Sequence, residues 1–455
     1  MFQSINPFNN KVLGEFAVWD ASQIEQALST ANTAAESWRQ VPLTDRADYL
    51  CRVASVLRQR KALLAKIVTM EMGKLLTEAE AEVEKCATVC EYYAEHSQSF
   101  LADQALASDA TRSFVAFQPL GCILAVMPWN FPLWQVFRFA APALMAGNTG
   151  LLKHASNVPQ CALAIEDVFK EAGLPEGVFS SLMIKASQVA VVIEDPRVHA
   201  VTLTGSEPAG RSVAALAGQN LKKSVLELGG ADAFIVLDDA DLAQAVQGAV
   251  TSRFLNAGQS CIAAKRFIVV ESVADAFVAS FAQACEGLTR GDPLKSTTRL
   301  APMARADLRD EVHQQVLTTL EQGGQAVIGC ELVNESESDS FYPASIIDNV
   351  KPGMLAYEEE LFGPVASVIR VKDEAEALSV ANSSRFGLGG SVWTRDVQRG
   401  EAVARNVASG ACFVNSIVKS DPRLPFGGIK ASGYGRELAH WGMHEFVNIK
   451  TISVG

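Results

Sequence analysis

Hydrophobic residues recur at helical spacing through residues 21–100 of the chain. Residues 45–72 and 76–100 carry apolar side chains every three or four positions with little Gly or Pro, which predicts long helices. From residue 121 the pattern changes to short apolar runs, each followed by a turn and a segment of helical periodicity. Strands that alternate with helices of this size are typical of βαβ units. We therefore predict an α/β fold with a doubly wound parallel sheet.

The apolar runs also predict where the individual elements lie. Strands of the first sheet are expected at 121–128, 150–156, 179–184 and 199–205, with helices at 133–146, 158–172, 187–194 and 208–218. A second series begins near Ala233, with strands at 234–237, 266–270, 326–330 and 365–371 and helices at 242–255, 273–288 and 374–383. A chain of 455 residues is too long for one core, so we expect two or three domains.

Three further stretches are expected at the surface. Residues 331–341 are acidic and polar, which is typical of an exposed loop. Residues 111–118 and 446–454 alternate between apolar and polar positions, as exposed strands do. An unpaired strand edge is a liability in a folded protein, so we expect the C-terminal strand to join a partner subunit.

Charge and cysteine usage narrow the class of protein. The net charge of −12 argues against binding to nucleic acid or to an anionic membrane surface. The nine cysteines are scattered and form no CxxC pair, which predicts a reduced, cytoplasmic protein without disulfides or a metal site. The N-terminus lacks the features of a signal peptide, and the apolar stretch 133–147 is too short to span a membrane.

Two residues stand in surroundings that favour chemistry. Cys261 lies in the run GQSC, where small and polar neighbours offer backbone N–H groups and little bulk. Glu227 lies between two leucines in LELGG, and a lone carboxylate in an apolar strand end is costly without a partner or a task. Together they predict a thiol nucleophile served by a carboxylate base.

The segment 199–212 predicts a phosphate-binding turn. Its strand ends at Thr204, a helix follows, and residues 205–212 read GxxxxGRS, one residue from the P-loop pattern. A P-loop nucleotide hydrolase is therefore an alternative, weakened because Arg211 replaces the lysine. A strand–Gly–helix turn also holds a pyrophosphate on helix N–H groups, and we favour a dinucleotide site. The first unit has no GxGxxG, so the dinucleotide must be held differently from an ordinary Rossmann fold.

Six motifs together resemble the aldehyde dehydrogenase family, and they occur in the family's order across nearly the whole chain. They are PWNFP at 128–132, TGS at 204–206, LELGG at 226–230, GQSC at 258–261, EEELFGP at 358–364 and PFGGIKASGYGRE at 425–437. The resemblance implies three parts and a homodimer or homotetramer. The parts are an NAD(P)-binding domain at 1–102 and 119–227, a catalytic domain at 228–424, and oligomerisation segments at 103–118 and 440–455.

The resemblance also implies a mechanism. Cys261 attacks the aldehyde as a thiolate, so the site is expected to favour the anion. Asn130 and the backbone N–H of Cys261 hold the oxyanion. A nicotinamide takes the hydride, and Glu227 activates the water that releases the acid. A non-catalytic relative is disfavoured because Cys261, Glu227 and Asn130 are all present.

Resemblance to the family also assigns a cofactor site. Glu360 is expected to hold the nicotinamide ribose and Phe362 to pack beside it. Trp129 and Lys153 are expected at the adenosine half, and Gly205 and Ser206 near the pyrophosphate. The full set of expected cofactor-binding residues is Met127, Trp129, Lys153, His154, Ser156, Gly205, Ser206, Leu228, Glu360 and Phe362.

Two of these residues bear on the choice between NAD and NADP. NAD-preferring relatives carry a glutamate at the place of Ser156, and serine cannot repel a 2′-phosphate by charge. His154 replaces the proline that is frequent in the family, and its ring is expected to crowd that phosphate. We predict that both cofactors work, with NAD preferred and NADP accepted.

Arg138 is the only charged residue in the helix after PWNFP, and an arginine there needs a counter-ion. One interpretation is a structural ion pair with an acid elsewhere. The other comes from succinate-semialdehyde dehydrogenases, which resemble this chain in having an arginine at this offset and a serine at the place of Ser420. Their second arginine corresponds to Leu255 here, for which Arg253 or Arg423 is a candidate substitute. We expect succinate semialdehyde as the substrate, with glutarate semialdehyde or a short aliphatic aldehyde as alternatives.

Overall fold

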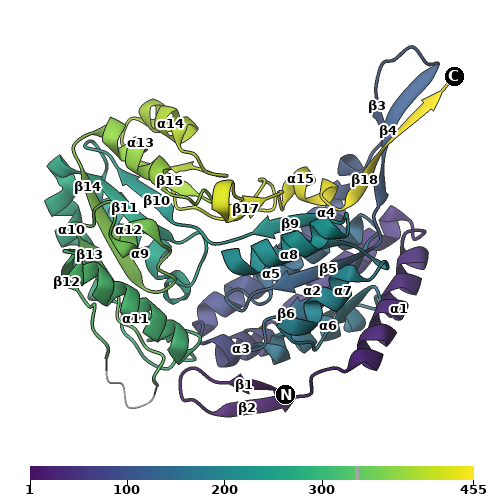
Figure 1. The fold of residues 1–455 in the computed structure, drawn as a ribbon, viewed down its shortest axis with the longest axis horizontal. Helices are drawn as coiled ribbons and strands as arrows, with labels where there is room; N and C mark the ends of the chain where they lie inside the picture. The colour runs from purple at the N-terminus through teal and green to yellow at the C-terminus, as the bar shows by residue number, and fades with distance from the viewer. Residues whose placement is uncertain (334–337) are drawn as a thin grey trace.

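The described part of the chain, residues 1–333 and 338–455, forms two α/β lobes and a projecting arm in a computed structural model (Figure 1). One lobe is built on a six-stranded sheet and the other on a seven-stranded sheet. The predicted α/β class with a doubly wound parallel sheet is confirmed.

The six-stranded sheet has the order β17-β9-β8-β5-β6-β7. Its parallel strands are β5 (Cys122–Met127), β6 (Thr149–His154), β7 (Phe179–Ser181), β8 (Val198–Thr204) and β9 (Lys223–Glu227), and β17 (Gly433–Tyr434) pairs antiparallel with β9. The chain runs from β5 outward through β6 and β7, then returns to the other side of β5 with β8. This reversal of strand order creates the crevice at the carboxyl ends where α/β sheets bind ligands.

Helices cover both faces of this sheet because successive strand residues point to opposite sides. Ile123 and Ala125 on β5 belong to the core formed with α2 to α6, whereas Cys122 and Leu124 belong to the core formed with α1, α7 and α8. The helices are α1 (Ala21–Trp38), α2 (Leu43–Gln59), α3 (Lys61–Met72), α4 (Leu76–Phe100), α5 (Trp134–Met145), α6 (Pro159–Glu171), α7 (Val189–Glu194) and α8 (Glu207–Gln219).

The seven-stranded sheet has the order β12-β13-β14-β11-β10-β15-β16, in which only β12 runs antiparallel to its neighbour among the described strands. Its strands are β10 (Asp232–Val236), β11 (Ala264–Val270), β12 (Gln325–Ile328), β13 (Ser345–Asp348), β14 (Val365–Val371), β15 (Gly390–Trp393) and β16 (Phe413–Val414). Its helices are α9 (Leu242–Phe254), α10 (Glu271–Cys285), α11 (Ala306–Glu321), α12 (Leu355–Glu358), α13 (Glu374–Ser383) and α14 (Val397–Asn406). Phe234 and Val236 face α9 and α10, and Ile235 faces α11, α13 and α14.

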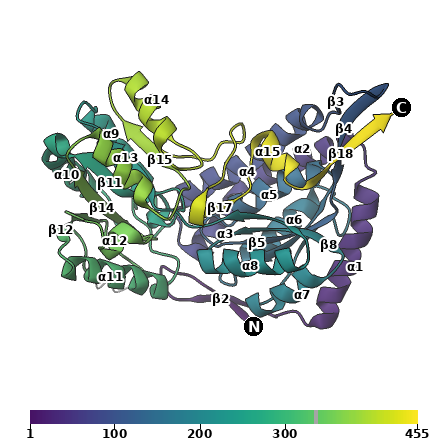
Figure 2. The same cartoon turned by 45° about the horizontal axis from the view of Figure 1, so that its top comes forward.

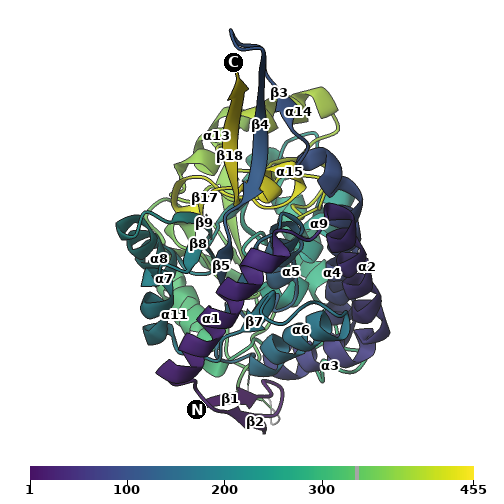
Figure 3. The same ribbon diagram turned by 90° about the vertical axis from the view of Figure 1, so that its right-hand side faces the viewer.

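The projecting arm is a three-stranded sheet of order β18-β4-β3 (Figure 3). It consists of β3 (Gln104–Ala105), β4 (Arg112–Pro119) and β18 (Val447–Val454). In this register β18 pairs with β4 of its own chain and sets Ile449 opposite Phe117, so the expectation that the C-terminal strand joins a partner subunit stays a prediction that concerns its other edge. The outer edge of β18 has no strand beside it among the described residues.

The C-terminal segment returns from the second lobe to the first before it reaches the arm. In Figure 2, β17 and α15 (Ala439–His444) lie between the lobes and the base of the arm. Gly433 of β17 pairs with Glu227 of β9, so residues after 424 complete the sheet that carries the expected base. At the other end of the chain, β1 (Phe2–Ile5) and β2 (Val12–Phe16) form a hairpin. No helix among the described residues has the length and apolar character needed to cross a membrane.

Most predicted elements are found, with two differences. The helix expected over 45–72 is two helices that meet at Arg60, where no Gly or Pro marks the break. Of the loop expected at 331–341, residues 334–337 lie outside the described residues. Ser338, Ser340 and Phe341 are buried rather than exposed, because Ser338 donates to the carbonyl of Pro7 at 2.5 Å and draws this segment onto the N-terminal hairpin.

Candidate active site

A strained loop leads into the predicted nucleophile. Asn256, Ala257 and Gly258 have φ values of 54°, 52° and 73°, in the left-handed region that costs about 1–2 kcal/mol per residue for side chains larger than glycine. The surroundings hold the loop in place. The Asn256 amide donates to the carbonyl of Asn130 at 2.8 Å, and Arg253 donates to the carbonyl of Gly258 at 2.5 Å. The loop is therefore fixed before any substrate arrives.

Cys261 follows this loop and lies half-buried at the wall of a cavity. Lys265 donates to the Cys261 carbonyl at 2.6 Å. Burial raises the pKa of the Cys261 thiol to about 12, even though Arg138 and Lys265 act to lower it. The protein's own groups therefore do not favour the thiolate in this structure, because desolvation outweighs two nearby cations. That the site favours the anion stays a prediction for the enzyme with nicotinamide bound.

Asn130 lies beside the nucleophile loop. Its buried side-chain amide donates to the carbonyl of Gln259 at 3.0 Å, two residues before Cys261. The Gln259 side chain accepts from the backbone N–H of Ala304 at 2.9 Å, which anchors the loop from the other side. An amide nitrogen carries two hydrogens, so Asn130 keeps one N–H to donate to a substrate oxygen.

Glu227 lies at the end of β9 with a side chain only 2% exposed. Neither of its carboxylate oxygens has a hydrogen-bond partner among the described residues. Burial raises the pKa of Glu227 well above its usual range, and the nearby Glu437 carboxylate raises it further. The raised pKa gives this carboxylate the higher basicity expected of a candidate general base.

Arg138 is also buried, and its counter-ion is Glu437, with which it forms an ion pair. It donates to the hydroxyl of Thr204 at 3.3 Å, and its guanidinium lies 4.6 Å from the centre of the Phe426 ring. The interpretation of Arg138 as half of a structural ion pair therefore describes this structure. Arg138 still lines the cavity of Cys261, so a second role toward substrate stays open as a prediction.

The cavity at Cys261, which we call the thiol cavity, has a volume of about 140 Å³. Its lining includes Lys85, Trp134, Gln135, Arg138, Leu255, Cys261, Ile417, Ser420 and Phe426. A neighbouring cavity of about 320 Å³ shares Lys85, Phe131, Trp134 and Leu255 with it, which gives a path from α4 to the thiol. Neither arginine considered as a substitute lies in the lining. Arg253 is fully buried against the nucleophile loop, and Arg423 pairs with Asp421 at 2.6 Å.

Helix α4 contributes three charged residues to this region that sequence reasoning missed. Glu78 accepts from the backbone N–H of Asn256 in the nucleophile loop at 3.2 Å. Glu82 accepts from the backbone N–H groups of Leu133 and Trp134 at 2.9 Å each, at the start of α5. Lys85 donates to the Ser420 hydroxyl at 2.6 Å. The spacing of four and three residues puts them on one helix face, which was the available signal.

The predicted nicotinamide-side residues lie close together in space. Phe362 meets Trp129, which was expected at the adenosine half, edge to face with ring centres 5.9 Å apart. Glu360 lies against Gly229 and pairs with Lys265 at 2.9 Å, and that lysine also holds the Cys261 carbonyl. The Glu360 carboxylate is partly exposed, so it can accept from ribose hydroxyls. This arrangement fits a nicotinamide nucleotide beside the thiol.

The predicted adenosine-side residues lie at the carboxyl ends of β6 and β8. Lys153 has no hydrogen-bond or ion-pair partner within the described ranges, and burial lowers its pKa. Ser206 is exposed at the first turn of α8 and makes no side-chain cap, which leaves helix N–H groups for phosphate. Arg211, the residue at the P-loop lysine position, is exposed and pairs with Glu207 at 2.8 Å, so it does not point to a phosphate.

The remaining expected cofactor residues differ in whether their side chains are exposed to solvent. Ser156 is exposed, whereas Met127 and Leu228 are buried. The His154 ring is also buried, with one nitrogen 2.8 Å from the carbonyl of Pro132 and the other accepting from the Ala155 N–H at 2.8 Å. Because both ring nitrogens are engaged inside the protein, this structure gives no support to the idea that His154 crowds a 2′-phosphate.

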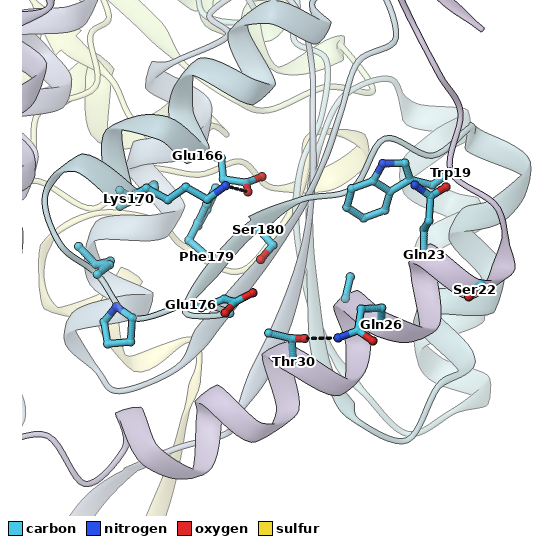
Figure 4. Close-up of a pocket in the computed structure, with 15 residues that line it drawn as sticks. Trp19, Ser22, Gln23, Gln26, Thr30, Glu166, Lys170, Glu176, Phe179 and Ser180 are labelled. Carbon is cyan, nitrogen blue, oxygen red and sulfur yellow. Dashed lines mark hydrogen bonds and ion pairs between the residues drawn. The ribbon is translucent and has the colours of Figure 1, made fainter.

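A larger cavity of about 690 Å³ lies elsewhere, between α1 and the edge strand β7 (Figure 4). Trp19 and Gln26 line it on one side and Phe179 on the other. Two of its charged groups pair with each other, since Lys170 lies 2.8 Å from Glu166, and Glu176 lines the cavity as well. None of the predicted site residues lines it, so size does not identify the active site here.

A doubly wound nucleotide-type sheet, joined to a lobe that presents a cavity thiol, defines an NAD(P)-dependent dehydrogenase that works through cysteine. Residues 1–452 match the aldehyde dehydrogenase family, and the chain belongs to that family. This membership leaves no place for the P-loop hydrolase considered from the sequence.

Similar proteins include enzymes named for one aldehyde. The chain is 48% identical over 449 residues to the probable succinate-semialdehyde dehydrogenase (NADP(+)) of Synechocystis sp., covering 99% of this chain and 98% of that one. It is 46% identical over 449 residues to the succinate semialdehyde dehydrogenase (NAD(P)+) Sad of Escherichia coli, covering 99% and 97%. The crystal structure of succinic semialdehyde dehydrogenase from Streptococcus pyogenes in complex with NADP+ has 41% identity and a TM-score of 0.98, with both chains covered at 100%.

Proposed function

We propose that this protein oxidises succinate semialdehyde to succinate with NAD(P) through a thioester on Cys261. The observation that carries the proposal is the thiol cavity, where the Cys261 thiol, Arg138 and Ser420 line one small space. Positive side chains and a hydroxyl in a narrow apolar cavity favour an aldehyde that carries a distal carboxylate. Relatives named for this substrate support the same conclusion.

The residues divide the chemistry between them. The Cys261 sulfur adds to the aldehyde carbon, and the oxygen that becomes negative accepts from the Asn130 amide and the Cys261 N–H. A bound oxidised nicotinamide supplies the hydride acceptor, and its positive charge adds to Arg138 and Lys265 in favouring the thiolate. Glu227 then takes a proton from water, hydroxide adds to the thioester carbon, and the thiolate leaves as succinate forms.

We propose that NADP is used at least as readily as NAD. Ser156 is exposed and uncharged, so it does not repel a 2′-phosphate, and Lys153 beside it carries positive charge without a partner within the described ranges. The buried His154 ring removes the physical reason for a preference for NAD. The names of the relatives, which print NADP(+) or NAD(P)+, favour this choice.

We further propose a homodimer or homotetramer that assembles through the arm. The arm carries apolar residues with no cover, since Ile449 on β18 is 60% exposed and Val454 is 47% exposed. The free edge of β18 is suited to strand pairing or packing against a second copy.

All nine cysteines are free thiols, which supports the expected reducing location in the cytoplasm.

The test is a comparison of aldehydes by the absorbance of the reduced cofactor. We expect kcat/KM for succinate semialdehyde to exceed that for butanal by at least about tenfold, because one charge-assisted contact is worth that much. Glutarate semialdehyde, one methylene longer, should lie between them. Equal kcat/KM for butanal and succinate semialdehyde would rule out the carboxylated substrate, and activity in Cys261→Ser would rule out the thioester route.

A further inference from the structure

We propose that Lys85, together with Ser420, is the group that binds the distal carboxylate of the substrate and sets the specificity for carboxylated aldehydes. This inference rests on the proposed function and adds to it a residue from α4, outside every motif that carries the family resemblance. Three cations line the thiol cavity, Lys85, Arg138 and Lys419, and they differ in whether a carboxylate already neutralises them.

The positive charge of Arg138 is already neutralised by a carboxylate inside the protein. It forms an ion pair with Glu437, donates to Thr204 and lies over the ring of Phe426. A guanidinium held by a buried carboxylate offers a reduced field to a second carboxylate. A substrate that relied on Arg138 alone would have to share it with Glu437.

Lys85 is the partly buried cation of the cavity that no carboxylate neutralises by contact. Lys419 also lines the cavity without such a contact among the described residues, but its side chain is exposed to solvent, which weakens its pull on a ligand inside. Within the described ranges no carboxylate lies within ion-pair distance of the Lys85 ammonium group. Two acids act on the pKa of Lys85 from a distance, Glu82 and Asp421. Each forms an ion pair with another residue, Glu82 with Lys74 and Asp421 with Arg423. An uncompensated ammonium at a cavity wall is costly unless a ligand brings the opposite charge.

The surroundings of Lys85 aim it into the cavity. Its ammonium lies 4.1 Å from the centre of the Trp134 ring, which fixes the side chain against α5. One of its three N–H groups donates to the Ser420 oxygen at 2.6 Å, which leaves two for a ligand. Because Ser420 accepts from Lys85, its own hydroxyl hydrogen is free to donate. The pair therefore offers three donors, enough for both oxygens of a carboxylate.

Lys85 also lies at the right place along the path to the thiol. It lines both the thiol cavity and the neighbouring cavity, so an aldehyde that reaches Cys261 passes it. The thiol cavity of about 140 Å³ admits a short chain, which places the far end of such a substrate near Lys85 when its aldehyde meets Cys261. Charge and chain length are thereby selected together.

The ionisation of Lys85 supplies an independent readout. Burial lowers its pKa to about 8, and Arg138 on α5 lowers it as well. Three groups raise it: Cys86 and Glu82 on α4, and Asp421 in the segment between β16 and β17. Lysine is charged below its pKa, so KM for succinate semialdehyde should be lowest below pH 8 and rise above it. KM for butanal should not follow this change.

The decisive experiment measures kcat and KM for succinate semialdehyde and butanal in the wild type, Lys85→Met, Lys85→Arg and the control Lys66→Met. Lys66 is an exposed lysine on α3, so its loss removes one charge far from the cavity. We expect Lys85→Met to raise KM for succinate semialdehyde about 10- to 100-fold and to leave kcat/KM for butanal within about threefold. Lys85→Arg should recover most of the loss and keep KM low above pH 8.

Each result separates the inference from the proposed function. A wild type that oxidises both aldehydes equally would overturn the proposed function, and Lys85 as carboxylate site with it. A wild-type preference that persists in Lys85→Met would overturn the Lys85 assignment alone. If Lys85→Met does not fold, Ser420→Ala carries the test, because it removes one donor and should raise KM for succinate semialdehyde about 3- to 10-fold. An unchanged KM in Ser420→Ala would contradict the shared site.

Discussion

The chemistry of the site depends on two buried carboxylates, Glu227 and Glu437, that lie near the guanidinium of Arg138. Arg138 pairs with Glu437, and Glu227 lies close enough for both groups to act on its pKa. Ionising both carboxylates is costly in a buried site, so the pKa of Glu227, which has no ion-pair contact with Arg138, is raised by burial and by Glu437. Glu227 is therefore set apart as the group that can accept and release a proton during turnover.

Replacing Glu227 by Gln should separate the two halves of the reaction. The amide cannot take a proton from water, so the thioester should form at a normal rate and then persist. Rapid mixing with succinate semialdehyde and NADP should show a burst of one reduced cofactor per subunit. The steady-state rate after the burst should fall at least about 100-fold. A variant that turns over at the wild-type steady rate would mean that another group activates the water.

The same substitution should change the pH dependence of stability. The pKa of Glu227 is raised by burial in the folded protein, so folding is favoured while the group is protonated, and this advantage is lost as pH rises through the folded-state pKa. Glu227→Gln removes the ionisable proton. We expect the variant to match the wild type near pH 4, where the unfolded chain also keeps the proton, and to be more stable by about 1–3 kcal/mol at high pH. Urea unfolding at both pH values measures this, and equal stability at high pH would contradict the buried charge.

Single residues also show how far the sequence could lead. Cys261, Glu227 and Asn130 were predicted from short motifs, because each sits in a run of unusual composition. The structure places Asn130 against the loop that precedes Cys261, and it places Glu227 near Arg138, which lines the cavity of Cys261. The pairing of Arg138 with Glu437 was not predictable, because its partner lies some 300 positions away by their residue numbers and only the fold brings them together. The neutral thiol was missed for the same reason, since burial is a property of the packed site.

At the scale of elements, α4 organises the active site although it contains none of the family motifs. Its residues Glu78, Glu82 and Lys85 reach the nucleophile loop, the start of α5 and Ser420. The sequence predicts the helix well, but charges on an amphipathic helix usually form its solvated face. Here part of that charged face is turned inward, which only tertiary packing decides. The break at Arg60 between α2 and α3 was likewise invisible without a Gly or Pro signal.

Glu82 gives this arrangement a direct test. Its carboxylate pairs with buried Lys74 and accepts two backbone N–H groups that start α5, so its loss leaves a buried ammonium without a counter-ion. We expect Glu82→Gln to destabilise the protein by about 3–5 kcal/mol. Glu84→Gln on the same helix is the control, because its exposed ion pair with Arg58 is worth about 1 kcal/mol or less. Denaturant unfolding of both variants checks the difference, and equal losses would mean that Glu82 acts only as surface charge.

At the scale of the whole molecule, the active site forms where chain segments far apart in sequence meet. The first lobe provides Glu227 and Asn130, the second provides Cys261 and Glu360, and the C-terminal segment returns through β17 to pair with the strand of Glu227. The sequence predicted two α/β series but not that β17 joins the first sheet, because two residues carry too little pattern to assign a strand. The same limit applies to β18, whose alternation predicts a strand without naming its partner.

The arm formed by β3, β4 and β18 is the proposed contact between copies of the chain, and a change in oligomeric state tests it. Ile449 lies on β18 with 60% of its surface exposed, so an aspartate there should leave the folded subunit intact but place a charge in a contact between copies. We expect Ile449→Asp to lower the sedimentation coefficient to that of a monomer at micromolar concentration. Asn448→Asp is the control, because successive side chains of a strand point to opposite faces and the size change is small. If both variants sediment like the wild type, the arm is not the contact that holds the copies together, and if the wild type itself is a monomer, the proposed homo-oligomer is wrong.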